Sequence, residues 1–228
     1  MVVDWREPIR NYCERLDGSF WSEPLNAVTN AGFVFAAAAA LALLMRRRRR
    51  DPAALALIVV TATVGVGSFL FHTLATRGAM LLDVIPIAVF IYGFFLLALR
   101  RFFALGAVAS IVATALFAVA SLLLDSFVDG LNCSVSYLPA LVAVAGFSAL
   151  LWRRNPAAAR GLAAAGAVFL LSLVFRTIDK TICPVLPTGT HFIWHSLNAV
   201  VLWLLLRTAI LEAPQAIPSQ KAKEPTAA

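Results

Sequence analysis

The chain contains three histidines, and each lies within a strongly apolar segment. His191 and His195 are four residues apart in GTHFIWHSLNAV, and His72 lies in GSFLFHTL. Residues four apart share one face of a helix, so the first two imidazoles would point the same way. Three neutral imidazoles could supply three corners of a tetrahedral zinc site and leave the fourth for water. The alternative is that each histidine makes an ordinary hydrogen bond between helices.

Two further polar residues accompany the histidines. Ser68 lies one helical turn before His72, and Asp83 lies in the next apolar segment. A carboxylate could transfer protons or orient a metal ligand, and a hydroxyl could donate to a developing oxyanion. Polar groups are costly in hydrocarbon and usually face the interior of a helix bundle for a functional reason. These residues together predict a metal-dependent hydrolytic site.

The composition indicates an integral membrane protein. The 228 residues are 61% hydrophobic and 14% charged, whereas soluble domains carry about 25% charged residues. A crossing helix needs about 20 apolar residues. Seven segments qualify, with boundaries defined to within a few residues: 25–45, 53–74, 79–99, 102–124, 137–152, 160–178 and 190–211. They predict an all-α fold that consists of a bundle of seven transmembrane helices.

This pattern divides the chain into three parts. Residues 1–24 form a polar outer segment, residues 25–211 the seven-helix domain, and residues 212–228 a tail predicted to be disordered. The N-terminal segment lacks the basic and apolar regions of a cleavable signal peptide. The net charge of +7 could suggest nucleic acid, but the basic residues fall in short clusters between apolar segments. We therefore expect no nucleic-acid partner.

The basic residues also predict the orientation in the membrane. Thirteen of the 19 Lys and Arg residues follow the first, third, fifth and seventh predicted spans or lie beyond them, with the largest cluster at Arg46–Arg50. Positively charged loops stay in the cytoplasm. The N-terminus is therefore expected outside and the C-terminus in the cytoplasm, which places the histidines, Ser68 and Asp83 in the outer half of the membrane.

The three cysteines, Cys13, Cys133 and Cys183, all fall on the predicted outer side, where disulfides persist. At most one pair can form within the chain, and the spacing leaves the pairing open. Arg176 and Asp179 are three residues apart at the outer end of the sixth predicted span. They are expected either to pair with each other or to brace the loop that holds Cys183.

The chain resembles the alkaline ceramidase family over nearly its whole length. The resemblance lies in Ser68-x-x-x-His72, Asp83 and His191-x-x-x-His195, with DWREP at 4–8, FWSEPLNAVTN at 20–30 and RTIDKTIC at 176–183. It implies an intramembrane amidase that cleaves ceramide, its lipid partner, into a sphingoid base and a fatty acid. It also implies zinc held by the three histidines, catalytic roles for Ser68 and Asp83, and an outer N-terminus. The related progestin and adipoQ receptors have the opposite orientation.

The same resemblance implies a calcium site and a disulfide in the outer segment. Calcium would be bound at Asp4, Trp5, Glu7 and Glu23, together with a family asparagine position at which this chain has Ile9. Alternatively, these carboxylates pair with Arg6, Arg10 and Arg15 in solvent. The disulfide would join Cys13 to Cys183 and leave Cys133 free, although the family cysteine lies where this chain has Arg6.

The sequence is also compatible with other functions. The same site could hydrolyse another acyl lipid, whether ester or amide. A non-enzymatic receptor with structural zinc is a second alternative, but structural sites are usually closed by four protein ligands. A transporter is a third, but no pair of broken helices of the kind expected at a midplane site is visible.

Overall fold

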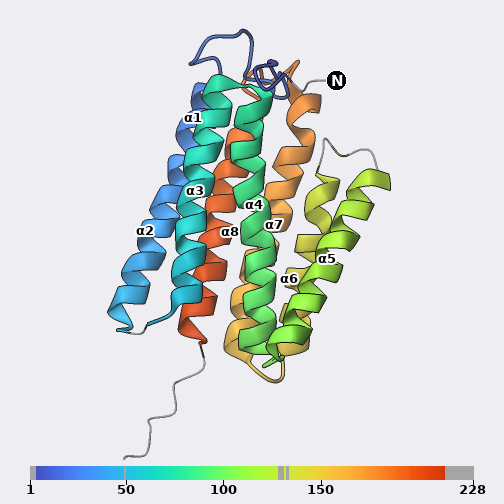
Figure 1. The fold of residues 1–228 in the computed structure, drawn as a ribbon. Coiled ribbons are helices and arrows are strands. Elements are labelled where there is room, and N and C mark those ends of the chain that lie inside the picture. The colour runs from blue at the N-terminus through green and yellow to red at the C-terminus, as the bar shows by residue number, and fades with distance from the viewer. Residues whose placement is uncertain (1–3, 49, 128–130, 132–133, 214–228) are drawn as a thin grey trace, which may run out of the picture.

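The computed structural model describes residues 4–48, 50–127, 131 and 134–213 (Figure 1). Residues 4–23 are irregular, and from Pro24 onward the described residues are helical apart from short connections. Six helical segments are long and apolar enough to cross a membrane: α1–α2 (Pro24–Thr29 and Ala31–Arg46), α3 (Pro52–Leu74), α4 (Arg77–Phe102), α5 (Ala107–Phe127), α7 (Pro156–Ile182) and α8 (His191–Leu211). Large apolar side chains cover the outside, with Phe35 73% and Val108 76% exposed. Such a surface is compatible with lipid and not with water, so the helices indicate a multi-pass membrane protein.

The predicted fifth span, 137–152, corresponds to a shorter helix. A 3₁₀ turn, η2 (Val135–Tyr137), leads into α6 (Leu138–Leu151), which has 14 residues. At 1.5 Å per residue α6 is about 21 Å long, less than the roughly 30 Å of hydrocarbon. Its apolar run is limited by Pro139 in the first turn and by Arg153 and Arg154 after its end. The seventh crossing therefore stays a prediction.

Local sequence signals explain where several helices begin. Proline stands in the first turn of α1, α3 and α7, where a missing N–H costs nothing. The side chains of Asp51 and Asn155 each accept the backbone N–H three residues later, at 3.0 Å. Thr76 caps α4 in the same way. Side-chain caps of this kind satisfy amide groups that the helix itself leaves unpaired.

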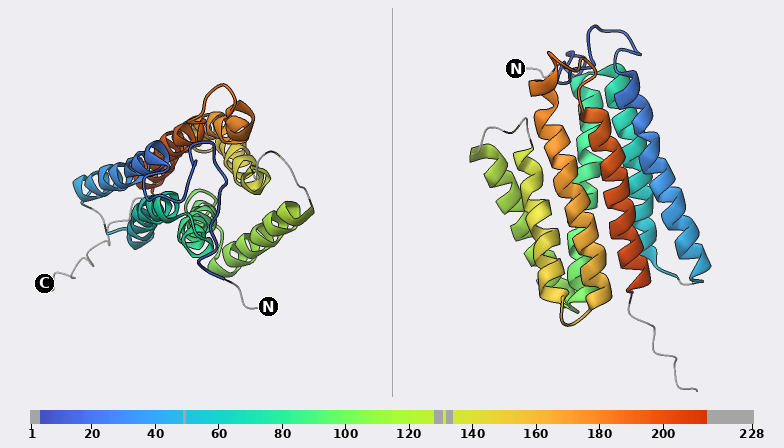
Figure 2. Two further views of the ribbon diagram at one scale, coloured as in Figure 1. Left: turned by 90° about the horizontal axis from the view of Figure 1, so that it is seen from above. Right: turned by 180° about the vertical axis from the view of Figure 1, so that it is seen from behind.

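The helices form one bundle in which α8 packs against α2, α3 and α7 (Figure 2). α5 packs mainly along α4 at the edge of the bundle. At the end where α8 finishes, Arg101 donates to both carboxylate oxygens of Asp51 at 2.9 and 2.8 Å, and to the carbonyl of Ala209 at 2.6 Å. This contact ties together the neighbouring ends of α3, α4 and α8.

The described part of the N-terminal segment, residues 4–23, crosses the opposite end of the bundle, and we call it the cap (Figure 1). Its first residues pair by backbone hydrogen bonds with the α3–α4 connection, including Ile9 N–H to the Ala75 carbonyl at 2.7 Å and Gly78 N–H to the Trp5 carbonyl at 3.0 Å. The predicted disordered tail lies mostly outside the described residues, since residues 214–228 are not among them.

Candidate metal centre and lipid cavity

The three histidines meet beneath the cap. His72 lies near the end of α3, while His191 and His195 lie in the first two turns of α8. Each offers a nitrogen within 4.8 Å of the other two, and all three residues are buried, with exposures of 0, 2 and 2%. Among the residues that the structure describes, no other group of histidine, cysteine or acidic side chains gathers in this way.

The hydrogen bonds of the imidazoles fit a metal site. His72 has its Nδ1 2.6 Å from Glu23 Oε2, and His195 has its Nδ1 3.2 Å from Thr29 Oγ1. The remaining ring nitrogen of His72, Nε2, and the Nδ1 of His191 are buried without a hydrogen-bond partner. A metal-ligating histidine usually holds one nitrogen in a hydrogen bond and gives the other to the ion. The donor set is therefore suited to a divalent metal.

Asp179 fixes the start of α8. Its Oδ1 accepts the backbone N–H groups of Thr190 at 2.7 Å and His191 at 3.0 Å. This carboxylate is fully buried and lies so close to Gly189 that a Cβ there would be 2.2 Å from Oδ1; Gly189 also has a left-handed φ of +62°. Asp179 therefore braces the loop before α8, which is one of the two roles expected for it. The loop in turn positions His191.

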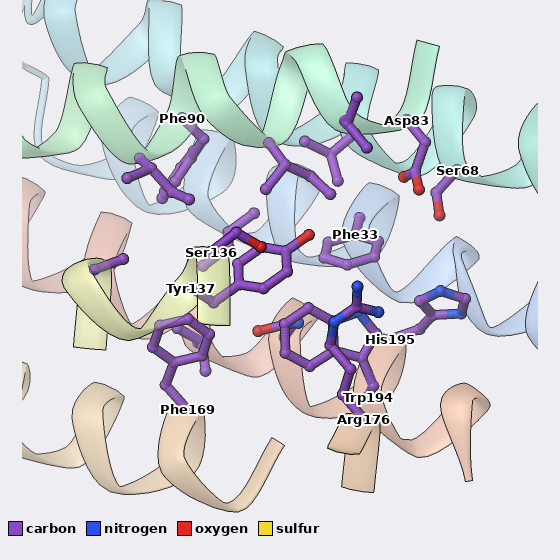
Figure 3. Close-up of a pocket in the computed structure, with 18 of the residues that line it drawn as sticks. Phe33, Ser68, Asp83, Phe90, Ser136, Tyr137, Phe169, Arg176, Trp194 and His195 are labelled. Atoms are coloured by element: carbon purple, nitrogen blue, oxygen red, sulfur yellow. The ribbon is translucent and has the colours of Figure 1, made fainter. Parts of the chain in front are cut away.

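Ser68 on α3 and Asp83 on α4 lie beside each other, and His195 lies across the pocket from them (Figure 3). Both are buried, and Oδ1 of Asp83 has no hydrogen-bond partner. Gly67 allows this approach, because a Cβ at Gly67 would lie 1.9 Å from the carbonyl oxygen of Leu82. Gly67 therefore allows the backbones of α3 and α4 to come into close contact. This contact brings Ser68 and Asp83 together.

An elongated cavity of about 270 Å³ extends from these polar groups into the bundle. Ser68, Asp83, His191 and His195 line its polar end. Its other walls are mostly apolar, and they include Phe90, Phe94, Phe117, Val144, Phe169 and Leu205 (Figure 3). Lining residues on α8 run from His191 to Leu205, which corresponds to about 21 Å along the helix axis. A long apolar cavity with polar groups at one end suits a lipid.

Comparison with known families agrees with this geometry. Residues 4–223 match the family model described as ceramidase. The chain belongs to the ceramidase family. Membership supports a ceramide-hydrolysing enzyme, that is, a hydrolase acting on amides, with a lipid substrate and a membrane location. No curated protein matches the chain significantly.

The cap adds groups to the site that the sequence analysis did not identify. The ring of Tyr12 stacks on His191, with ring centroids 3.8 Å apart, and lies 5.0 Å from the ring of His72. Burial raises the pKa of the Tyr12 phenol above its usual value, so the group stays neutral. Glu14 accepts the N–H groups of Leu25 and Asn26 at 2.7 and 2.8 Å and so caps α1.

Arg176 also lines the ceramidase cavity. Its guanidinium carbon lies 5.1 Å from the ring centroid of Tyr137 and 5.2 Å from that of Trp194. Both distances fall within the range of cation–π contacts. The sequence placed this arginine near Asp179, three residues away, and could not show that aromatic rings from η2 and α8 would lie next to its charge.

A disulfide joins the ceramidase cap to the loop before α8. It links Cys13 to Cys183, whose Cα atoms are 5.4 Å apart and whose positions are 170 residues apart in sequence. This is the pair that the family resemblance implied. Cys133, expected to be free, lies outside the described residues.

The residues expected to bind calcium are not gathered at one point. Glu7 pairs with Arg77 at 2.5 Å in an exposed ion pair, and Asp4 Oδ1 accepts the N–H of Arg6 at 2.9 Å. Trp5 uses its carbonyl for Gly78. Glu23 is buried and contacts Arg15, His72 and Asn26. The calcium site therefore stays a prediction. Glu23 does pair with Arg15, as the alternative expected, but this pair is buried and not in solvent, since Arg15 is 6% exposed.

Proposed function

We propose that this ceramidase is a zinc-dependent intramembrane amidohydrolase that converts ceramide into a sphingoid base and a fatty acid. The observation that carries the proposal is the combination of a buried three-histidine cluster with Ser68 and Asp83 at the polar end of an apolar cavity. His72, His191 and His195 would hold the metal. The family match supports the substrate class, and the cavity explains how an acyl chain could lie beside the reacting groups.

Zinc in such a site lowers the pKa of water to about 7 and polarises a carbonyl. The chain's own residues would do the rest. An oxygen of Asp83 would take a proton from the attacking water and give it to the amide nitrogen as the C–N bond breaks. Ser68 Oγ would donate a hydrogen bond to the carbonyl oxygen as negative charge develops there. The acyl carbon keeps the water oxygen and leaves as the fatty acid, and the sphingoid base leaves as the amine.

The cap would close the outer end of this site. The clusters of basic residues favour an outer N-terminus and a cytoplasmic C-terminus. The three histidines would then lie in the outer half of the membrane. The apolar walls of the cavity would then extend toward the cytoplasmic half. Tyr12, stacked on His191, would separate the reacting groups from bulk water above them.

The test combines metal analysis with lipid hydrolysis by the purified full chain. We expect about one zinc per chain and release of fatty acid from ceramide. His72→Ala, His191→Ala and His195→Ala should each lose both zinc and activity. A variant that keeps stoichiometric zinc would contradict the three-histidine site.

A parallel assay addresses the alternative substrate. Phospholipid esters carrying the same acyl chain should be hydrolysed far more slowly than ceramide. Faster release from the ester would identify an acyl-ester hydrolase instead. Stoichiometric zinc without hydrolysis of either lipid class would favour the receptor alternative.

A further inference from the structure

Arg15 belongs to the cap, yet its side chain is only 2% exposed. Its Nε donates to Glu23 Oε1, and its Nη2 donates to the backbone carbonyl of His72 at 2.7 Å. Its Nη1 reaches the carbonyls of Asp17 and Ser19 at 3.3 and 3.4 Å. One guanidinium is therefore surrounded by one carboxylate oxygen and three carbonyl oxygens, which come from two parts of the cap and from the end of α3.

Carboxylate and carbonyl oxygens are the ligands that proteins offer to hard cations such as calcium. In this chain the guanidinium of Arg15, and not a metal ion, lies at the centre of such a group of oxygens. The guanidinium is always protonated and presents five donors in a fixed plane, so it can neutralise a carboxylate and bind several carbonyls at once. A buried charge of this kind is stable only because its hydrogen bonds are satisfied.

Glu23 connects Arg15 to the candidate metal centre, because it contacts both Arg15 and His72. Its other oxygen, Oε2, lies 2.6 Å from His72 Nδ1 and accepts from Asn26 Nδ2 at 3.0 Å. Glu23 therefore bridges Arg15 and His72 with its two carboxylate oxygens. A carboxylate in this position can hold the Nδ1–H of His72 and leave Nε2 for the metal.

We infer that Arg15 is a positioning residue that acts as the built-in cation of the cap. It holds Glu23 against His72 and docks the cap on α3 without an added ion. Asp4, Trp5 and Glu7 are engaged elsewhere, as described above, so this chain does not depend on calcium to assemble the site. The inference rests on the proposed function only in so far as His72 is a zinc ligand.

The first experiment measures zinc affinity by competition with a chelating dye, using Arg15→Gln, Arg15→Lys and the control Arg10→Gln. Arg10 is an exposed arginine of the same cap. Loss of groups that orient metal ligands typically costs about 10- to 100-fold in affinity. Arg15→Gln should lose about 10-fold, at the low end of that range, because Arg15 acts through Glu23. Arg15→Lys, which keeps the charge, should lose less, and Arg10→Gln should be unchanged.

A double-mutant cycle then tests whether the effect passes through Glu23. Glu23→Gln can still accept a hydrogen bond from His72, but it no longer attracts the guanidinium. Adding Arg15→Gln to Glu23→Gln should therefore weaken zinc binding little further, a clear departure from additivity. The visible spectrum of the cobalt-substituted protein should also change in Arg15→Gln, because it reports the geometry of the ligands. Additive losses, or equal losses for the glutamine and lysine variants, would overturn the inference.

The last measurement does not need zinc or ceramide. The melting temperature of the metal-free wild type should not change when calcium is added to about 1 mM, a level that fills many extracellular calcium sites. Metal-free Arg15→Gln should melt below Arg10→Gln. A calcium-dependent rise in the wild type would show that an added ion, and not Arg15, holds the cap. If the wild type binds no zinc, the proposed function fails, and the inference is judged by this melting comparison alone.

Discussion

At the scale of single residues, the proposed function distinguishes side chains that would hold a metal from side chains that would contact only the substrate. The three histidines bring nitrogens within 4.8 Å of one another, whereas Ser68 and Asp83 lie next to each other on α3 and α4 (Figure 3). The unpartnered Asp83 Oδ1 is buried at the polar end of the cavity. Such an oxygen is available for a proton-transfer role that a structural carboxylate, fully hydrogen-bonded like that of Asp179, could not take.

Ser68→Ala and Asp83→Asn should therefore keep zinc but lose turnover. Removing one oxyanion donor typically lowers the rate by roughly 100- to 1000-fold, and Asp83→Asn removes the group that accepts the proton. Fatty acid release and zinc content measured on the same preparations will check this. Ser196→Ala, on the exposed face of α8, is the control and should behave as wild type. A Ser68→Ala rate within a factor of about three of wild type would leave Ser68 without its assigned role.

At this scale the sequence was informative where chemistry and helical spacing coincide. His191 and His195 are four apart, so their shared face followed directly from helix geometry. The roles of Tyr12 and Arg15 could not be predicted in the same way. Their contacts with His191, His72 and Glu23 depend on the path of an irregular segment, and that path has no periodicity from which to infer a direction.

At the level of helices, the site depends on how closely α3 and α4 approach. Gly67 is the point of closest contact, since its missing side chain makes room for the carbonyl of Leu82. Ser68 and Asp83 are the next residues along their helices. The distance between the two helix backbones therefore sets the distance between the two side chains.

Gly67→Ala should separate α3 from α4 and impair catalysis. The added methyl group cannot be accommodated against a backbone carbonyl, and overpacking typically costs about 1–3 kcal/mol. We expect a lower melting temperature and a strong loss of ceramide hydrolysis. Gly146→Ala is a matched control, because a Cβ on that glycine of α6 meets no atom within 4 Å. That variant should be neutral or slightly more stable, as alanine favours a helix. Equal effects of the two substitutions would mean that helix propensity, and not the contact between α3 and α4, determines the change in stability and activity.

The helices themselves were largely predictable. Apolar runs bounded by proline, capping residues and arginine clusters predicted six long segments within about five residues of their observed ends, and the largest difference is at the start of α5, predicted at 102 and observed at Ala107. The fifth predicted span shows the limit of this reasoning. A run of apolar residues at 137–152 indicates burial in lipid or protein, but length and composition alone do not show whether so short a helix crosses the membrane.

For the whole molecule, the cap connects helices that are distant in sequence. It contacts the α3–α4 connection through its first residues, α3 through Arg15, and the loop before α8 through the Cys13–Cys183 disulfide. The three histidines lie below these contacts. The stability of the metal centre should therefore depend on covalent attachment of the cap.

Replacing Cys13 and Cys183 together by serine should lower both the melting temperature and the retention of zinc. Native disulfides typically contribute about 2–4 kcal/mol, and the freed cap would no longer restrain the start of α8. Peptide mapping without reduction should recover the Cys13–Cys183 link in the wild type. Cys133→Ser is the control for loss of a cysteine. Recovery of a Cys133–Cys183 link would contradict the pairing.

The separation of 170 residues between Cys13 and Cys183 also imposes an order on biosynthesis. At roughly 5–20 residues per second, a ribosome needs about 10 to 30 seconds to pass from the first cysteine to the second. His72 is made during that interval, whereas neither histidine of α8 has been made when the interval ends. The nascent chain thus holds a single imidazole of the cluster, so it has no complete centre with which to capture metal. The three-histidine cluster is complete only after the start of the last helix has been synthesised, whereas the disulfide of the cap needs only Cys183, which is made just before that helix.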